Sequence, residues 1–181
     1  MNIRPRLMGK TIFKDIRGKF CESFNKSYWD SKGINFVADY VSWSRKKALR
    51  GIHYQTVEPQ GKLVSVVNGS IYDFCVDVRD NDPNTFGHCY WFILLSGSFS
   101  LWIPPGFAHG YISLENGTIV TYKTTSHRHA KHEVVIRYDD PSINLAPSIN
   151  LAHCIKHRGP FILSKKDKAG IWLKDAPRVR I

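Results

Sequence analysis

Residues 62–77 read KLVSVVNGSIYDFCVD, and this stretch indicates the class of fold. A Val-rich run at 62–67 precedes Asn68-Gly69, and a run with alternating side chains follows at 70–78. Val, Ile, Phe and Tyr favour strands, and Asn-Gly is the strongest short hairpin signal because both residues tolerate positive φ. The stretch therefore predicts two antiparallel strands joined by a tight hairpin turn.

The same pattern continues on the C-terminal side of this stretch. Strand-like runs occur at 89–95, 101–103, 109–114 and 118–124, with turn residues between them. The segment 115–117, Glu-Asn-Gly, lies between the last two runs and predicts a second hairpin. Many short strands at a spacing of about 8–12 residues indicate an antiparallel sandwich or barrel.

Helical periodicity is scarce, and two short helices are predicted. One lies near 26–32 and ends before Gly33, and the other begins at Ser164. Residues 138–157 are rich in Pro, Asn and Ser, which predicts an irregular segment. No linker or repeat interrupts the chain, so we expect 1–181 to form a single domain.

The composition excludes several classes of protein. Of the 181 residues, 43% are apolar and 23% charged, as in ordinary globular chains rather than collagen, coiled coils or disordered proteins. No apolar stretch reaches the roughly 18 residues of a membrane span, so we expect no membrane partner. The N-terminal residues lack the apolar core of an export signal, so we expect no secretory signal.

The cysteine pattern favours a reducing compartment. Cys21, Cys75, Cys89 and Cys154 form no CxxC pair and match no zinc spacing. Cys75 and Cys89 lie in strand-like apolar runs, where a free cysteine behaves as a small apolar residue. A disulfide framework is not expected without export, and we place the protein in the cytoplasm.

The charge balance indicates an anionic ligand. Lys and Arg number 26 against 15 Asp and Glu, which gives a net charge of +11. Nucleic acid is the first candidate partner, but the basic residues are dispersed and no nucleic-acid-binding motif accompanies them. A small, doubly negative ligand such as a nucleotide diphosphate would also favour a positive pocket, so composition leaves both ligands open.

Residues 104–109, PPGFAH, resemble half of the cupin signature P-x-G-x-x-H. Cupins are double-sheet jelly rolls, and the strand pattern agrees, so we expect an all-β, double-sheet jelly roll with a few short helices. A metal-binding cupin also carries an earlier H-x-H pair followed by a carboxylate. Here the earlier segment, 51–55, holds His53 alone, so no metal is expected and the inward histidines are candidates for acid–base work.

Several collinear segments strongly resemble the dTDP-4-dehydrorhamnose 3,5-epimerase family. The resemblance runs from about residue 11 to residue 170 in the order of the family, through the blocks 15–24, 49–55, 60–64, 102–110, 122–125, 136–141 and 162–167. It implies an enzyme that needs no cofactor and inverts C3 and C5 of a 4-keto-6-deoxy sugar on a nucleotide diphosphate. Such a reaction needs a base, an acid on the opposite face of the ring, and a group that stabilises the enolate.

The resemblance also implies which residues do this chemistry. His53 would be the base, Asp167 the carboxylate that orients it, Lys62 the enolate stabiliser, Tyr122 the acid and His109 a residue of the pocket wall. Each has a structural alternative. His53 can be a core residue, Tyr122 a strand aromatic and Lys62 the exposed start of a strand. Asp167 can cap the helix that begins at Ser164, and His109 can belong to the jelly-roll pattern alone.

Further matches concern the nucleotide. Arg17 and Arg50 are candidates for the diphosphate because a guanidinium pairs two oxygens at once. Phe20 and Glu22 match positions that contact the nucleotide. In the family the N-terminal strand crosses to a partner, so the region 1–24 is expected to complete the site of the other subunit of a homodimer.

The match to the family breaks at two places. Ala38 and Tyr40 stand where the family usually carries Gln and Asn, and Arg128 stands where a Tyr often stacks on thymine. Arg128 can stack on a base or belong to a solvated loop. The nucleotide base, the sugar and the number of inverted carbons therefore stay open. The alternatives are a C3-only epimerase, a non-catalytic nucleotide-sugar or nucleic-acid binder, and a metal-dependent cupin.

Overall fold

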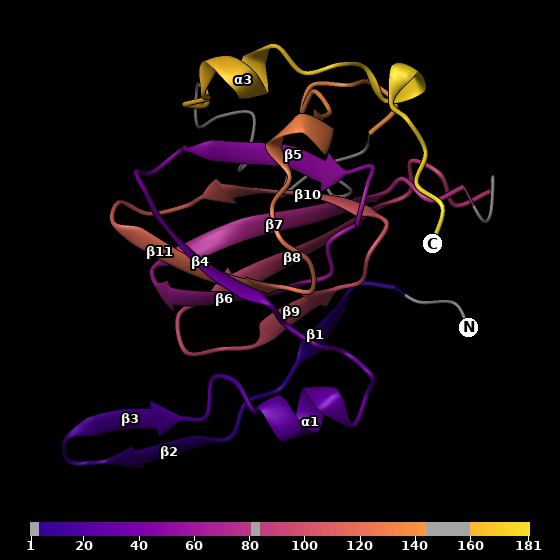
Figure 1. The fold of residues 1–181 in the computed structure, drawn as a ribbon. Helices are drawn as coiled ribbons and strands as arrows, with labels where there is room; N and C mark the ends of the chain where they lie inside the picture. The colour runs from indigo at the N-terminus through magenta and orange to yellow at the C-terminus, as the bar shows by residue number, and fades with distance from the viewer. Residues whose placement is uncertain (1–3, 81–83, 144–159) are drawn as a thin grey trace.

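The computed structural model describes residues 4–80, 84–143 and 160–181. Two antiparallel sheets of five strands face each other, as Figure 1 shows. This confirms the expected all-β jelly roll. The first sheet has the order β1 (Arg6–Met8), β9 (Ser100–Ile103), β6 (Lys62–Asn68), β11 (Thr118–Thr124) and β4 (Ala38–Ser44). The second has the order β12 (Glu133–Val135), β5 (Leu49–Gln55), β10 (Phe107–Ser113), β7 (Ser70–Asp77) and β8 (Cys89–Leu95).

Short elements complete the described chain. A two-stranded hairpin of β2 (Ile12–Asp15) and β3 (Gly18–Cys21) projects from the body of the fold in Figure 1. The two predicted helices are present as α1 (Lys26–Asp30) and α3 (Lys165–Lys168), and single 3-10 turns, η1 and η2, form at Ala130–His132 and Leu173–Asp175. No described helix has the length and apolar character needed to span a membrane.

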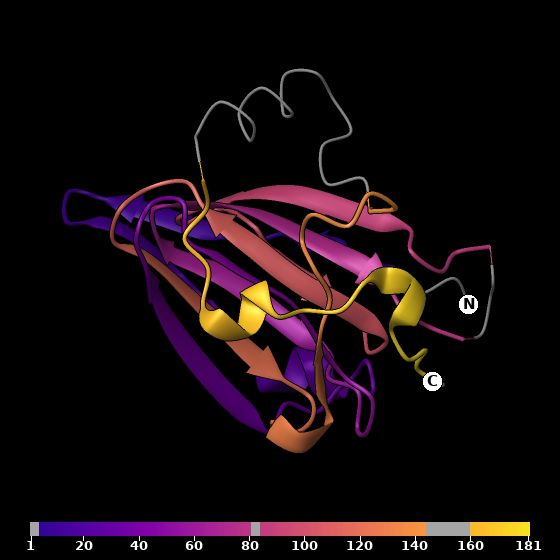
Figure 2. The ribbon, with the colours of Figure 1, turned by 90° about the horizontal axis from the view of Figure 1, so that it is seen from above.

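Two apolar cores lie on the two faces of the second sheet. Between the sheets, β6 contributes Val64 and Val66, and β7 contributes Ile71 and Cys75. On the outer face, Tyr72, Phe74 and Val76 of β7 pack against the C-terminal segment, which crosses the sheet in Figure 2. Every residue of β7 is therefore buried. Each fully buried large apolar side chain contributes about 1.5–3 kcal/mol, so this strand anchors the fold.

Both hairpin predictions were wrong. Asn68-Gly69 joins β6 to β7, and the 115–117 turn joins β10 to β11, but in each case the two strands belong to different sheets. Gly69 has φ +79°, so the turn residues do reverse the chain as predicted. The strands then pack face to face because each carries an apolar face that the shared core buries. Turn chemistry fixes the reversal and not the partner strand.

The predicted starts of both helices are confirmed, whereas α1 ends at Asp30 rather than at Lys32. The Asn25 side chain accepts a hydrogen bond from the Tyr28 amide at the start of α1, and Gly33 follows this helix with φ +70°. Ser164 caps α3, as its place in the sequence predicted. Of the segment 138–157, residues 138–143 form no helix or strand, while 144–157, and Cys154 with them, lie outside the described residues.

Candidate active site

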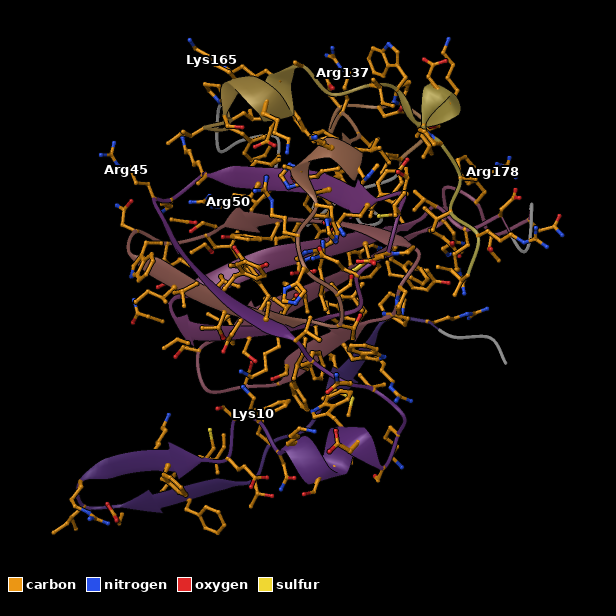
Figure 3. All side chains as sticks on the ribbon, viewed as in Figure 1. Lys10, Arg45, Arg50, Arg137, Lys165 and Arg178 are labelled. Carbon is orange, nitrogen blue, oxygen red and sulfur yellow. The ribbon has the colours of Figure 1, made fainter. Side chains whose placement is uncertain are left out.

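A cavity of about 390 Å³ lies between the two sheets and collects most of the predicted site residues. The residues of its wall that the sequence predicted are Arg50, His53, Lys62, His109, Tyr122, Arg128 and Asp167. They come from both sheets, from the segment before β12 and from α3. Figure 3 shows other basic side chains, such as Arg45, Arg137 and Arg178, on separate parts of the surface, while Arg50 lies on β5 at the wall of the cavity.

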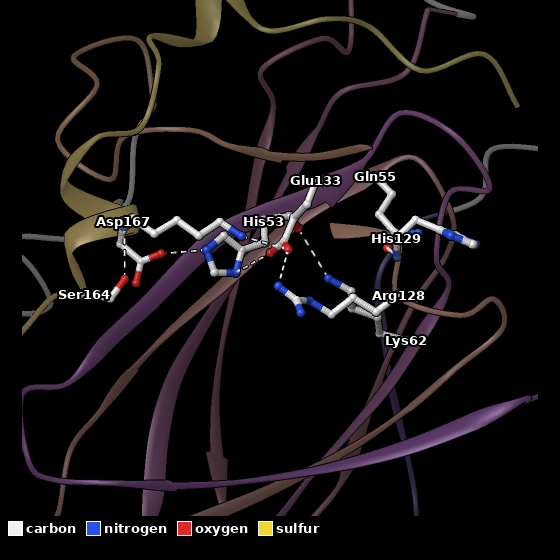
Figure 4. A network of polar contacts seen from close by, with 9 residues as sticks. His53, Gln55, Lys62, Arg128, His129, Glu133, Ser164 and Asp167 are labelled. Carbon is white, nitrogen blue, oxygen red and sulfur yellow. Dashed lines mark hydrogen bonds and ion pairs between the residues drawn. The ribbon is translucent and has the colours of Figure 1, made fainter. Parts of the chain in front are cut away.

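His53 and Asp167 form a hydrogen-bonded pair although 114 residues separate them. β5 carries His53, α3 carries Asp167, and His53 Nε2 lies 2.6 Å from Asp167 Oδ1 (Figure 4). Burial by itself would raise the pKa of Asp167, but hydrogen bonds from His53 and Ser164 hold the pKa below its usual value. Asp167 is therefore ionised at neutral pH and fixes the imidazole ring.

Asp167 also takes part in the cap of α3. The Asp167 amide donates to Ser164 Oγ at 3.1 Å, and the Asp167 carboxylate accepts a hydrogen bond from the Ser164 backbone, as in a capping box. The helix cap therefore holds the backbone of Asp167 while its carboxylate points to His53. The two interpretations of this residue, helix cap and partner of the histidine, are compatible.

Lys62 lies beside this pair. Its Nζ donates to the backbone carbonyl of His53 at 3.3 Å. Burial lowers the pKa of Lys62 below the ordinary 10.5, although the neighbouring Cys75, Glu133 and Asp73 act in the opposite direction. A buried ammonium in such a cavity is a strong electrostatic partner for a developing oxyanion.

This placement predicts how activity depends on alkaline pH. As the pH rises, the rate should begin to fall before pH 10.5 is reached. Only the ammonium form of Lys62 stabilises an enolate, and burial lowers the pKa at which this form is lost. The profile of kcat against pH checks this in the native enzyme and in Lys62→Arg, whose guanidinium stays charged. Lys62→Arg should keep weak activity and lose this limb, and an unchanged limb would contradict the assignment.

Glu133 is a site residue that sequence reasoning missed. Its carboxylate binds Arg128 Nη2 at 2.7 Å and Lys166 Nζ at 2.8 Å, and lies 3.6 Å from His53 Nδ1. Burial raises the pKa of Glu133, but these cations outweigh it and hold the pKa below the usual value. The one signal in the sequence was a single carboxylate after a basic run, at 127–132.

Arg128 lines the cavity and pairs with Glu133, although its side chain is 54% exposed. Gln55 holds the segment on both sides of it, because its side chain donates to the His127 carbonyl at 3.2 Å and accepts from the His129 amide at 2.6 Å. Figure 4 shows this anchor next to the Arg128–Glu133 pair.

A second histidine–carboxylate pair lies deeper. His109 Nε2 lies 2.8 Å from Asp73 Oδ2, on neighbouring strands β10 and β7. Asp73 is fully buried, and burial raises its pKa despite the nearby His109. Sequence reasoning did not single out Asp73, although a carboxylate in an apolar strand was the available signal.

Arg50 is fixed by backbone and hydroxyl groups of the edge strand β4. Its Nε donates to Ser44 Oγ at 3.0 Å, and its Nη2 donates to the Trp43 carbonyl at 2.9 Å. These contacts hold the guanidinium at the cavity wall.

Three predicted residues lie away from this cavity. Arg17 sits in the β2–β3 turn and pairs with Asp15, Phe20 is 72% exposed on β3, and Glu22 accepts from Asn25. Within one chain they do not meet the other site residues.

Comparison with known proteins agrees with this geometry. The sequence model described as dTDP-4-dehydrorhamnose 3,5-epimerase matches residues 6–175. The chain belongs to the dTDP-4-dehydrorhamnose 3,5-epimerase family. This confirms the resemblance seen in the sequence.

Members of this epimerase family share most of their length with the chain. The enzyme of that name from Escherichia coli K12 is 40% identical, and the match covers 94% of this chain and 90% of that enzyme. The enzyme from Methanothermobacter thermautotrophicus is 36% identical, and the match covers 92% of this chain and 88% of that enzyme. A crystal structure of a dTDP-6-deoxy-D-glucose-3,5-epimerase from Legionella pneumophila, in complex with dTDP-4-keto-L-rhamnose, superposes with a TM-score of 0.86 at 36% identity. It covers 98% of this chain and 93% of that one.

Proposed function

We propose that this epimerase inverts C3 and C5 of a dTDP-linked 4-keto-6-deoxy sugar and that His53 is its base. Membership of the family establishes an epimerase of a nucleotide-linked 4-keto sugar. The observation that carries the mechanism is the 2.6 Å pair of His53 and Asp167 in one cavity with the buried ammonium of Lys62. A metal-free proton abstraction next to a ketone needs this combination.

The residues divide the reaction between them. Asp167 hydrogen-bonds Nε2 of His53, whereas Glu133 lies 3.6 Å from Nδ1, beyond hydrogen-bond distance, so Nδ1 is the nitrogen that takes a proton from the carbon beside the ketone. The electron pair of the broken C–H bond moves onto the ketone oxygen, where Lys62 stabilises the enolate. Tyr122 then returns a proton to the opposite face and is itself reprotonated from solvent. His53 releases its proton to solvent before the next cycle.

The charged groups at the cavity wall suit the nucleotide diphosphate. Arg50 is already oriented by β4, and Lys166 and Arg128 share the carboxylate of Glu133. A diphosphate that enters here meets these cations and competes with Glu133 for two of them. This accounts for part of the strong positive charge without a nucleic-acid partner.

The protein is proposed to act as a homodimer in the cytoplasm, with the N-terminal region 1–24 completing the partner's site. Phe13 and Phe20 on the projecting hairpin are 59% and 72% exposed, and Trp43 and Val67 on the outer face of the first sheet are 67% and 56% exposed. A second copy of the chain would cover these apolar side chains. Light scattering should give twice the 20.8 kDa of one chain, and an active species of 20.8 kDa would contradict the dimer.

Solvent deuterium incorporation tests the activity. The protein is mixed with dTDP-4-keto-6-deoxy-glucose in D₂O, and the H3 and H5 signals are followed by NMR. Exchange at both positions together with a new epimer is the expected result. Exchange and inversion at C3 alone would show a C3-only epimerase, and no exchange at either carbon would overturn the proposal.

A further inference from the structure

Tyrosines line several sides of the cavity, and the fold already uses the hydroxyls of two of them. Tyr54 donates to the Pro177 carbonyl at 2.6 Å. The Tyr111 hydroxyl lies between Ser42 Oγ and Ser44 Oγ, at 2.7 and 3.1 Å. Burial raises the pKa of both phenols. Both hydroxyls are already hydrogen-bonded within the fold.

Tyr40 and Tyr122 are in a different situation. They are directly opposite each other on the neighbouring strands β4 and β11, and their ring centroids are 6.3 Å apart with planes tilted by 34°. Both line the cavity. Within 4–80, 84–143 and 160–181 no group hydrogen-bonds either hydroxyl. The cavity therefore presents two adjacent phenols that are available to a ligand.

The two sheets separate these phenols from the base. Tyr40 and Tyr122 belong to the first sheet, whereas His53 lies on β5 of the second sheet. Inversion of a carbon requires a base on one face of the sugar ring and an acid on the other. A ring bound between the sheets meets these requirements, because His53 faces one side of it and both phenols face the other.

We propose that Tyr40 is a second proton donor, so that the two phenols each reprotonate one of the two carbons beside the ketone. This rests on the proposed 3,5-epimerase function. In each half-reaction His53 removes a proton from one carbon, and the C–H electron pair becomes the enolate. One phenol then gives its proton to the opposite face of that carbon. The phenolate regains a proton from solvent, and the imidazolium loses one to solvent.

The test compares Tyr40→Phe, Tyr122→Phe and the double variant by NMR in D₂O. Each single variant should invert one carbon normally and lose inversion at the other by about 10²-fold or more, the usual contribution of a general acid. The carbon affected should differ between the two variants. The double variant should invert neither carbon but still exchange both protons, since His53 remains. Phenylalanine keeps the ring, so the wall of the cavity is preserved.

A control variant and two contrary results separate failure of this proposal from failure of the proposed function. Tyr28→Phe, on the exposed helix α1, removes a phenol outside the cavity and should leave both inversions unchanged. Wild-type rates at both carbons in Tyr40→Phe would overturn the proposal, as would loss at the same carbon in both single variants. Failure of the native enzyme to exchange either proton would instead refute the proposed function.

Discussion

Replacing His53 by alanine should abolish epimerisation and leave the fold intact. A general base contributes about 10²–10⁴-fold to the rate. Of the two cavity histidines with a carboxylate partner, His53 is the one whose partner, Asp167, has a pKa held below its usual value. Deuterium exchange at C3 and C5 should disappear with product formation, because the first step is lost. NMR of the sugar in D₂O measures both at once.

The fold should survive this change because the imidazole is 29% exposed and contributes little to either core. Thermal unfolding followed by circular dichroism checks this. His88→Ala provides a matched control, because His88 is exposed before β8 and outside the cavity. Near-native turnover in His53→Ala would remove the base assignment, whereas equal losses in both variants would show a general effect of losing a histidine.

The second large effect is expected for Lys62→Met. Removing one group that stabilises a developing oxyanion typically costs about 10²–10³ in kcat. Lys62 is half-buried, and burial lowers its pKa, so the charge is screened less than it would be in bulk water. Both exchange and inversion should slow, since the enolate precedes both, whereas Tyr122→Phe should slow inversion alone.

Stability separates this functional role from a structural one. A buried ammonium is costly to desolvate, and methionine has a similar length, so Lys62→Met should unfold at the same temperature as the native protein or higher. Lys174→Met, on the exposed turn η2, is the matched control for activity. A destabilised Lys62→Met with near-native kcat per folded molecule would show that Lys62 is structural.

The turn at Asn68-Gly69 shows the limit of local signals. The sequence located both strands and the reversal correctly, since Lys62–Asn68 and Ser70–Asp77 are strands. The prediction that the second strand pairs with the first was wrong. Alternating side chains indicate that one face of a strand is buried, but they do not indicate which surface covers that face. Face-to-face packing on β6 was decided by the shared core.

The site shows the same division. The resemblance to the family pointed to His53, Lys62, Tyr122 and Asp167, and the structure brings them into one cavity. Glu133 was missed because its role comes from cations that are distant in the chain or belong to the same basic run. No spacing rule describes a carboxylate of this kind.

The sequence by itself determined the all-β class, the start of each helix and the family, and the resemblance to that family named the residues proposed for the central chemistry. These follow from local preferences and from motifs whose residue types the chemistry requires. Only the tertiary structure decided which strands pair, which tyrosine hydroxyls are free, and that Glu133 joins His53 to Arg128 and Lys166. Those depend on distances between segments far apart in the chain, which packing of the whole fold sets and no local pattern records.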